Sequence, residues 1–398
     1  MKIGIDAKWY FNGPVSGKVI LQNVLPELIR QFPDHEWCLF MDKADRGKPL
    51  PFTASNVSIR YVWAGLNMLS NLFVLPSYIK KFRLELVLYQ TFPAKVRNCR
   101  AVAFIHDVLY EHFPGYFTGK ELLYLKPLRW LAPHADRIVT TTDTVKKDLL
   151  KFGYARDPTR VDLAPLGVSP VFKPLLLHDP LRIEQVQSHY RLPPEFLLFV
   201  GRLNIRKNIG NLLKALPLLE DRKIPLVIVG EEDWKSPRLQ ESLSDERVSG
   251  RVQFTGSVSD EDLPVIYALA KIFCYPSFAE GFGLPPLEAM ASGIPVVVSD
   301  TTSLPEVCGP AGNYIDPQKP ESIANMIDKI LTDKDLYKEK AEEGLLRARQ
   351  FSWEASASAL MKSLLRAAET PASQTNRTHA NPESTQPEST QPEKLLNK

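Results

Sequence analysis

Cysteine is scarce in this sequence, with four residues in a chain of 398. The four lie far apart, without a Cys-x-x-Cys pair and without a histidine at zinc-ligand spacing: Cys38, Cys99, Cys274 and Cys308. This pattern argues against a disulfide-dense secreted scaffold and against a zinc site. We therefore expect buried, reduced thiols.

An excess of charge of one sign is also absent. Lys and Arg number 49 against 46 Asp and Glu, which leaves a net charge of +3 dispersed along the chain. Proteins that bind nucleic acid carry a concentrated basic patch or stripe instead. We therefore expect no nucleic-acid partner.

Long hydrophobic runs are missing as well. No run approaches the roughly 18 to 20 consecutive apolar residues of a membrane-spanning helix. At the start of the chain, Asp6 and Lys8 stand where a signal peptide would need its apolar stretch. We expect a cytoplasmic protein.

The composition and patterning that are present indicate a folded α/β protein. Hydrophobic residues make up 44% of the chain and charged residues 24%, as in globular proteins. Short β-branched runs alternate with longer segments of helical period, which is typical of parallel sheets covered by helices on both faces. Because 398 residues exceed the roughly 250 to 300 at which a single core stops growing, the chain should divide in two.

We predict two doubly wound, Rossmann-like domains that face a cleft, over residues 1–170 and 171–368. An interdomain linker is expected near 168–194, where prolines disfavour sheet pairing. Ser352 is suited to cap a C-terminal helix from Trp353 to Ala368. Residues 369–398 are rich in Ser, Thr, Gln, Asn and Pro and repeat PESTQ, which predicts a disordered tail.

An acidic pair follows the expected strand IFCYPS. Glu280 precedes Gly281 and Gly283, which let the backbone approach a ligand closely, and Glu288 lies about two turns further on. Free amides at the start of the following helix favour an anionic ligand. On these residues alone, the alternative is one solvated loop acid and one helix-surface acid.

Two cations follow the expected strand FLLFV, in the segment GRLNIRKN. Arg202 and Lys207 should stand at the carboxyl edge of a parallel sheet, where a phosphate-bearing ligand would lie. Ordinary solvated basic residues are the alternative. Their position favours the phosphate role.

The first domain offers a histidine and a glycine-containing loop. His106 closes the strand AVAFI and precedes Asp107, and from this position alone a structural histidine is the favoured interpretation. The loop NGPVSGKVI carries Gly13 and Gly17 between the first strand and the first helix. It is one residue short of a P-loop and has Val19 where magnesium needs a hydroxyl, which excludes ATP binding in that mode.

Two Asp-x-Asp pairs match a metal-binding pattern of other transferases. Asp260 with Asp262, and Asp333 with Asp335, open expected helices. Acidic side chains at such positions stabilise exposed amides and the helix dipole. We therefore expect helix capping there and no metal.

Together these segments resemble the retaining glycosyltransferases of the GT-B fold, specifically the large family 4. The resemblance covers most of Met1 to Ala368 and rests on PLGVSPVFKP, GRLNIRKN, VQFTGSVSDEDLPVIYALA and EGFGLPPLEAMASGIPVV, in the family's order and spacing. It implies that Glu280 contacts the donor sugar and Glu288 the nucleotide ribose. It also implies that Arg202 and Lys207 hold the donor diphosphate.

The resemblance assigns further contacts to the backbone and to the first domain. The amides of the turn are expected to cover the sugar and phosphate, as substrate-binding groups of Gly281, Phe282, Gly283 and Leu284. His106 is expected against the donor sugar, and Asp107 should orient it or contact the acceptor. Gly13 and Gly17 should allow close approach to phosphate, although Pro14 and Ser16 depart from the commoner glycine pair of the family.

The resemblance predicts an enzyme that transfers a hexose from a nucleotide sugar, with retention, to a glycan or a lipid-linked acceptor in the synthesis of a cell-surface polysaccharide such as lipopolysaccharide. GDP-mannose is the favoured donor, ahead of UDP-glucose and UDP-N-acetylglucosamine. The expected catalytic residues are His106, Glu280, Arg202 and Lys207, with no cofactor, because the cations replace a metal. The alternatives are a non-catalytic nucleotide-sugar-binding protein, a glycan phosphorylase and an epimerase-like enzyme.

One segment raises the hypothesis of peripheral contact with the inner face of the cytoplasmic membrane. Residues 67–83 combine apolar side chains with Lys80, Lys81 and Arg83, a composition compatible with an interfacial helix. A helix whose apolar face points into the core is the favoured alternative.

Overall fold

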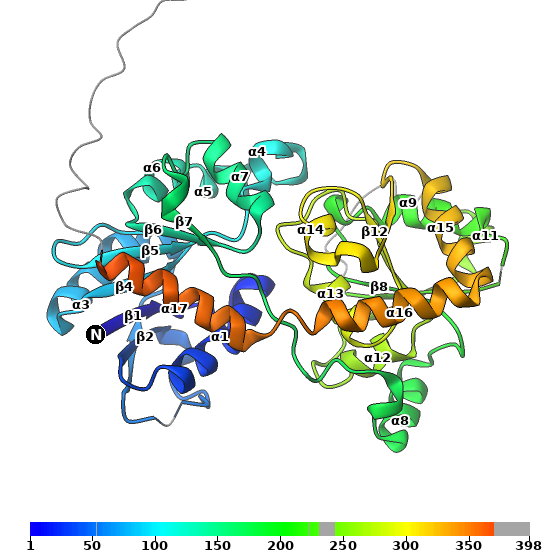
Figure 1. The fold of residues 1–398 in the computed structure, drawn as a ribbon, viewed down its shortest axis with the longest axis horizontal. Helices are drawn as coiled ribbons and strands as arrows, with labels where there is room; N and C mark the ends of the chain where they lie inside the picture. Colours follow the sequence, from blue (N-terminus) through cyan, green and yellow to red (C-terminus); the bar gives the residue numbers. More distant parts are fainter. Residues whose placement is uncertain (53, 222, 231–242, 370–398) are drawn as a thin grey trace, which may run out of the picture.

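The computed structural model describes residues 1–52, 54–221, 223–230 and 243–369, which form two sheet-centred halves joined by two chain crossings (Figure 1). Apart from Glu369, the predicted tail over 369–398 lies outside the described residues. All four cysteines are free, and Cys38, Cys274 and Cys308 are buried. The expectation of reduced thiols is met, with Cys99 only partly buried.

The first half contains a parallel sheet of seven strands in the order β3-β2-β1-β4-β5-β6-β7. Its strands are β1 Lys2–Asp6, β2 Glu36–Asp42, β3 Val57–Val62, β4 Leu86–Gln90, β5 Arg100–Phe104, β6 Arg137–Thr140 and β7 Val161–Leu163. The helices between them are α1 Val15–Gln31, α2 Asn67–Leu69, α3 Leu75–Phe82, α4 Leu109–His112, α5 Gly119–Leu125, α6 Leu128–Leu131 and α7 Asp143–Lys151.

The second half contains a parallel sheet of six strands in the order β10-β9-β8-β11-β12-β13. Its strands are β8 Leu197–Val200, β9 Leu226–Val229, β10 Val252–Gly256, β11 Ile272–Tyr275, β12 Val296–Ser299 and β13 Gly312–Ile315. Its helices are α8 Pro180–Tyr190, α9 Ile209–Ala215, α11 Glu246–Ser249, α12 Leu263–Leu269, α13 Leu284–Ala291, α14 Leu304–Cys308, α15 Pro320–Thr332 and α16 Lys334–Ala348.

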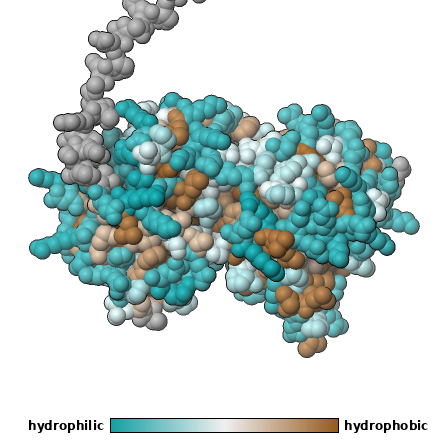
Figure 2. All heavy atoms as spheres, in the orientation of Figure 1, coloured by the Kyte–Doolittle hydropathy of each residue, from teal (hydrophilic) through white to brown (hydrophobic). Residues whose placement is uncertain are grey.

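Burial explains why the strands were visible as apolar runs. Every residue of β4, β8, β9, β11 and β12 is buried, as expected for parallel strands with helices on both faces. On the face that Figure 2 shows, the surface is mostly hydrophilic, with separate hydrophobic patches. In both sheets the strand order reverses beside the first strand, between β1 and β4 and between β8 and β11. Such a switch point is where open α/β sheets bind ligands.

The last helix corrects the predicted domain boundary. Helix α17, Trp353–Glu369, crosses back to the first half and lies along α1 (Figure 1). Asp162 at the edge of the first sheet accepts hydrogen bonds from Ser363 at 2.6 Å and from Arg366 at 2.8 Å. The expected second domain of residues 171–368 therefore loses its final helix to the first domain.

The two segments that connect the domains contact each other. The amide of Val168, in the outgoing crossing, donates to the carbonyl of Phe351, in the returning one, at 3.1 Å. A Cβ on Gly167 would lie 2.2 Å from the backbone nitrogen of Trp353, so only glycine fits there. As expected, the proline-rich stretch 168–194 forms no strand; it contains the short helix α8.

Candidate active site

Glu280 lies in a tight turn between β11 and α13. Its amide donates to the Thr302 hydroxyl at 2.9 Å, and the Ser303 hydroxyl donates to its carbonyl at 2.7 Å. Gly283 caps α13 with a φ of +117°, and a Cβ there would lie 2.8 Å from Leu304 Cδ2. These contacts hold the turn that contains Gly281 and Gly283 in one conformation.

The Glu280 carboxylate is buried among cations. It forms ion pairs of 2.8 Å with Arg206 Nη1 and with Lys207 Nζ, and it accepts a hydrogen bond from the Ser277 hydroxyl. Burial opposes its ionisation, but Arg206 and Lys207 outweigh burial and lower the pKa of Glu280 to about 2. The carboxylate is therefore ionised at neutral pH.

Lys207 is held between Glu280 and the Tyr275 hydroxyl. It ends a 3-10 turn, Ile205–Lys207, that follows β8, and its ammonium donates a hydrogen bond to the Tyr275 hydroxyl. Burial lowers the pKa of Lys207 to about 8, although Glu280 acts in the opposite sense. The structure thus places Lys207 against the turn that contains Glu280, and its predicted contact with the donor diphosphate stays a prediction.

Arg206 is a site residue that the sequence analysis missed. It contacts Glu280 and also donates to the carbonyl of Ala279 at 2.5 Å. Burial would lower its pKa, but Glu280 raises it further above its usual value. Arg202, the predicted partner of Lys207, instead has an exposed side chain at the end of β8. The adjacent Arg-Lys pair was the available signal for Arg206.

Glu288 lies on α13, two turns beyond Glu280. The Tyr267 hydroxyl, from α12, donates to Glu288 Oε2 at 2.9 Å. Burial raises the pKa of Glu288 to about 7. The two predicted acids therefore differ in charge near neutral pH, because only Glu280 has cationic partners.

The turn of the second domain touches the first domain at His106 and Asp107. A Cβ on Gly281 would lie 2.8 Å from Asp107 Cβ and 3.1 Å from the His106 carbonyl oxygen. The hydroxyls of Thr141 and Thr142 each donate to the Gly281 carbonyl at 3.2 Å. The structure therefore brings His106 and Asp107 of the first domain against the turn that follows β11 in the second.

His106 is partly exposed, but both of its ring nitrogens are buried and lack a hydrogen-bond partner among the described residues. Burial lowers its pKa to about 4, so the imidazole is neutral at physiological pH. Together with Asp107, it lines a cavity of about 360 Å³ in the first domain. Burial also raises the pKa of Asp107, against the opposing effect of Arg206.

A second contact between the domains lies beside this site. Glu306, on α14, accepts hydrogen bonds from the amides of Asp143 and Thr144 at 2.7 and 3.0 Å. It also accepts one from the Thr144 hydroxyl at 3.0 Å. The acid of one domain thus caps the first turn of α7 in the other.

Gly13 and Gly17 lie against a tryptophan. A Cβ on Gly13 would be 2.6 Å from Trp9 Cβ, and one on Gly17 would be 2.7 Å from Trp9 Cε3. In this structure, the absence of these side chains therefore makes room for Trp9. Gly17 also borders the cavity that His106 lines.

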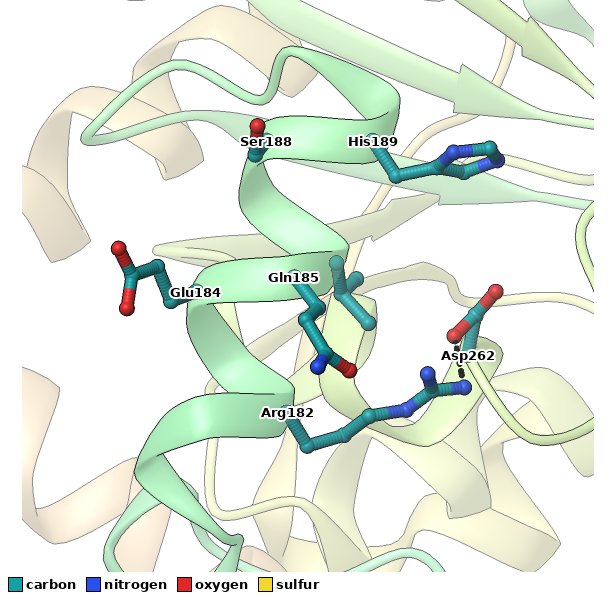
Figure 3. A pocket seen from close by; sticks show the side chains of 7 residues that line it. Arg182, Glu184, Gln185, Ser188, His189 and Asp262 are labelled. Carbon is teal, nitrogen blue, oxygen red and sulfur yellow. Dashed lines mark hydrogen bonds and ion pairs between the residues drawn. The ribbon is translucent and has the colours of Figure 1, made fainter.

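One acid of each rejected Asp-x-Asp pair has a structural partner. Asp262 precedes α12, but its side chain does not cap that helix as expected; it bonds instead to Arg182 of α8 (Figure 3) and accepts from the Tyr190 hydroxyl at 3.0 Å. The Asp333 side chain accepts from the amides of Asp335 and Leu336 at the start of α16, as expected for a cap. Within the described ranges, acids, histidines and cysteines form no cluster suited to a metal ion.

The family models match both halves of the chain. Residues 28–171 match Glycosyltransferase Family 4, and residues 183–347 match Glycosyl transferases group 1. The O-antigen chain mannosyltransferase B of Escherichia coli is 36% identical over 261 residues, which cover 64% of this chain and 67% of that protein. The chain belongs to the family 4 glycosyltransferases. It is an enzyme of the glycosyltransferase class, as the resemblance predicted.

Solved structures of glycosyltransferases share the fold. The sucrose-phosphate synthase of Thermosynechococcus elongatus superimposes with a TM-score of 0.72 at 20% identity, covering 92% of this chain and 98% of that one. Anabaena HepE in complex with UDP-glucose superimposes with a TM-score of 0.70 at 17% identity, covering 92% and 100%. The predicted GT-B fold is confirmed. The roles assigned to individual site residues of this glycosyltransferase stay predictions.

No helix among the described residues of this glycosyltransferase has the length and apolar character needed to cross a membrane.

Proposed function

We propose that this glycosyltransferase transfers a hexose, with mannose favoured, from a nucleotide-diphosphate sugar to a glycan or lipid-linked acceptor of a cell-surface polysaccharide, with retention at the anomeric carbon. The observation that carries the proposal is the buried cluster of Glu280, Arg206 and Lys207 beside His106. The similarity to an O-antigen chain mannosyltransferase supports the sugar and the pathway class.

The cluster supplies the charge that the reaction needs. As the bond between the anomeric carbon and phosphate breaks, negative charge grows on the leaving diphosphate. Lys207, the exposed Arg202 that follows the same strand and the backbone amides of Phe282, Gly283 and Leu284 at the start of α13 are suited to stabilise it. Glu280 holds Lys207 and Arg206 in place beforehand, so little reorganisation is required when the donor binds.

The first domain supplies the acceptor side. A neutral His106 beside the donor sugar can accept or donate a hydrogen bond without placing a second positive charge near the developing cationic sugar. The acceptor hydroxyl attacks from the face that the phosphate leaves. Its proton passes to the departing phosphate oxygen, and the chain needs no nucleophile of its own.

A panel of nucleotide sugars tests the proposed donor. A donor present at about 100 times its dissociation constant should stabilise the fold by roughly 2.7 kcal/mol in a thermal-shift assay. We expect GDP-mannose to give the largest shift, with UDP-glucose and UDP-N-acetylglucosamine as the alternatives. Turnover with and without acceptor then separates a transferase from a non-catalytic binder. The transferase proposal fails if no nucleotide sugar is consumed.

We also propose that the enzyme works in the cytoplasm, on the inner surface of the membrane, through residues 67–83. Leu75 and Ile79 of this segment are buried in the core, which agrees with the core-facing alternative. Phe73 is nevertheless 75% exposed, Leu66 just before the segment is 54% exposed, and three cations of the segment are exposed: Lys80, Lys81 and Arg83. Exposed apolar and cationic side chains together suit an anionic interface.

Flotation with anionic liposomes tests the membrane proposal. The parent should float at low salt, and Phe73→Glu should reduce flotation, whereas Leu176→Glu, at a linker position that is 96% exposed, should not. Absence of flotation by the parent would remove the membrane proposal and leave the transferase proposal intact.

A further inference from the structure

Arg206 binds the turn before α13 with both its main chain and its side chain. Its carbonyl accepts hydrogen bonds from the amide of Phe278 at 2.8 Å and from the Ser277 hydroxyl at 3.1 Å. Its guanidinium donates to the Ala279 carbonyl at 2.5 Å and pairs with Glu280 Oε2 at 2.8 Å. Arg206 therefore contacts each residue of this turn, and only the last two contacts depend on its side chain.

The two oxygens of the Glu280 carboxylate have different partners. Oε1 accepts from Lys207 Nζ at 2.8 Å and from the Ser277 hydroxyl. Among the described residues, Oε2 is paired with Arg206 alone. Because each carboxylate oxygen offers about two lone-pair sites, Oε1 is fully used and one acceptor site is left on Oε2, beside the guanidinium.

A ligand group that uses this remaining site has to be a hydrogen-bond donor. Glu280 is only 7% exposed, so a group that approaches Oε2 also loses most of its contact with water. Phosphate oxygens are acceptors and carry negative charge, which the carboxylate repels. Sugar hydroxyls are neutral donors. Of the parts of a nucleotide sugar, a hydroxyl therefore suits Oε2 and a phosphate does not.

The charge of Arg206 is already balanced within the protein. Burial opposes the charged form of Arg206, but Glu280 and also Asp107, across the domain contact, raise its pKa. Its guanidinium thus serves protein acids from both domains. Lys207 and the exposed Arg202 have no such second acid, which leaves the donor diphosphate to them and the orientation of Glu280 to Arg206.

We propose that Arg206 is a positioning residue, which fixes Glu280 Oε2 so that the remaining acceptor site of this oxygen receives a hydroxyl of the donor sugar. The inference rests on the proposed function, because it takes Glu280 as the residue that contacts the donor sugar. Arg206 then acts through Glu280 and does not contact the diphosphate. Recognition of the sugar, and not of the nucleotide, should therefore depend on the Arg206 side chain.

Two ligands that differ only in the sugar test this role. Calorimetric titration compares GDP-mannose with GDP, or the corresponding pair if the donor panel identifies another nucleotide sugar. Arg206→Gln should weaken the nucleotide sugar about tenfold and change the affinity for the nucleoside diphosphate less than about twofold. The main-chain contacts of Arg206 remain in this variant, so its melting temperature should stay close to that of the parent. Equal weakening of both ligands would indicate a phosphate contact and overturn the proposal.

A double-mutant cycle shows whether Arg206 acts through Glu280. Once Glu280→Gln has removed the carboxylate, adding Arg206→Gln should weaken the nucleotide sugar by less than about twofold more. Arg206→Lys keeps a cation beside Oε2 and should bind the nucleotide sugar at least about threefold more tightly than Arg206→Gln. Arg247→Gln, in an exposed surface ion pair, is the matched control and should change neither affinity. The role is refuted if Arg206→Gln has the same effect with and without Glu280, or if the lysine and glutamine variants bind equally.

The failure of this role and the failure of the proposed function are distinguishable. If Arg206 has no positioning role, the parent still binds and consumes its nucleotide sugar, and only the comparison of variants changes. If the parent consumes no nucleotide sugar, the transferase function on which this inference rests is lost.

Discussion

At the site, the pKa of a single residue depends more on its surroundings than on its residue type. Glu280 is buried and Glu288, two turns further on, is partly buried, yet the pKa of the first is about 2 and that of the second about 7. The difference arises because Arg206 and Lys207 face Glu280, whereas Glu288 has a tyrosine hydroxyl. Glu280 therefore holds Arg206 and Lys207 in place, whereas Glu288 changes its protonation state near neutral pH.

Removal of either predicted diphosphate cation should reduce turnover. Loss of one preorganised donor of this kind costs on the order of 100 to 1000 fold, so Arg202→Ala and Lys207→Ala should each lose turnover on that scale and stay folded. Steady-state kinetics measure the loss, with Arg247→Ala, in an exposed surface ion pair, as the control. EDTA should not inhibit the parent. If both variants stay within about threefold of the parent, or if EDTA abolishes activity, the metal-independent mechanism is wrong.

Donor affinity should rise as the pH increases from 6 to 8. Since burial raises the pKa of Glu288 to about 7, its carboxylate, the form that accepts hydrogen bonds from ribose hydroxyls, predominates only above that pH. At pH 6 the affinity for an intact nucleotide sugar should be several-fold to about tenfold weaker than at pH 8. Calorimetric titration at both pH values measures this. Glu288→Gln should lose the pH dependence, and an unchanged profile in that variant would contradict the assignment to ribose.

Some site residues could be predicted from the sequence and others could not, for physical reasons. Glu280 and Lys207 follow strand ends, and parallel strands bring such ends to one edge of the sheet, so their proximity was predictable. Arg206 turns toward Glu280 because of the 3-10 turn over Ile205–Lys207, which spacing alone does not reveal. The burial of the His106 ring nitrogens without a hydrogen-bond partner among the described residues arises from tertiary packing, which no local pattern encodes.

At the scale of elements, the contact between α14 and α7 should favour the arrangement in which the two domains touch each other. Glu306→Ala removes an acceptor from three groups of α7 and leaves its first turn to water. The loss of such a cap typically costs about 0.5 to 2 kcal/mol, which should appear as a raised KM for the donor. Steady-state kinetics measure the KM, and small-angle scattering should show a larger radius of gyration. Glu321→Ala, in the first turn of α15, is the control, and equal KM values in the two variants would refute the role.

Element types were predictable where burial leaves a mark on the sequence. The expected strands AVAFI, FLLFV and IFCYPS are present as β5, β8 and β11, because strands buried on both faces read as continuous apolar runs. The position of α17 was not predictable. Its apolar face shows that the helix is covered on one side, but the identity of the covering sheet depends on where the returning chain crosses.

At the scale of the whole molecule, residues after Thr370 should be dispensable. They are poor in apolar side chains and repetitive, so they can contribute little burial to the core. A chain ended at Thr370 should keep the melting temperature and the turnover of the parent. Differential scanning calorimetry and the transferase assay measure both. A melting temperature lower by several degrees would show that the removed segment packs on the body.

The return of α17 to the first domain has a consequence for biosynthesis. Trp353, Leu360, Met361 and Leu364 complete a core that otherwise consists of first-domain residues at their end of the molecule. At about 5 to 20 residues per second, α17 follows the last strand of that sheet out of the ribosome by roughly 10 to 40 s. During that interval the nascent first domain presents an uncovered apolar face. The two domains are therefore separate in architecture but not in folding order, and the newly made chain depends on its last helix for protection from aggregation.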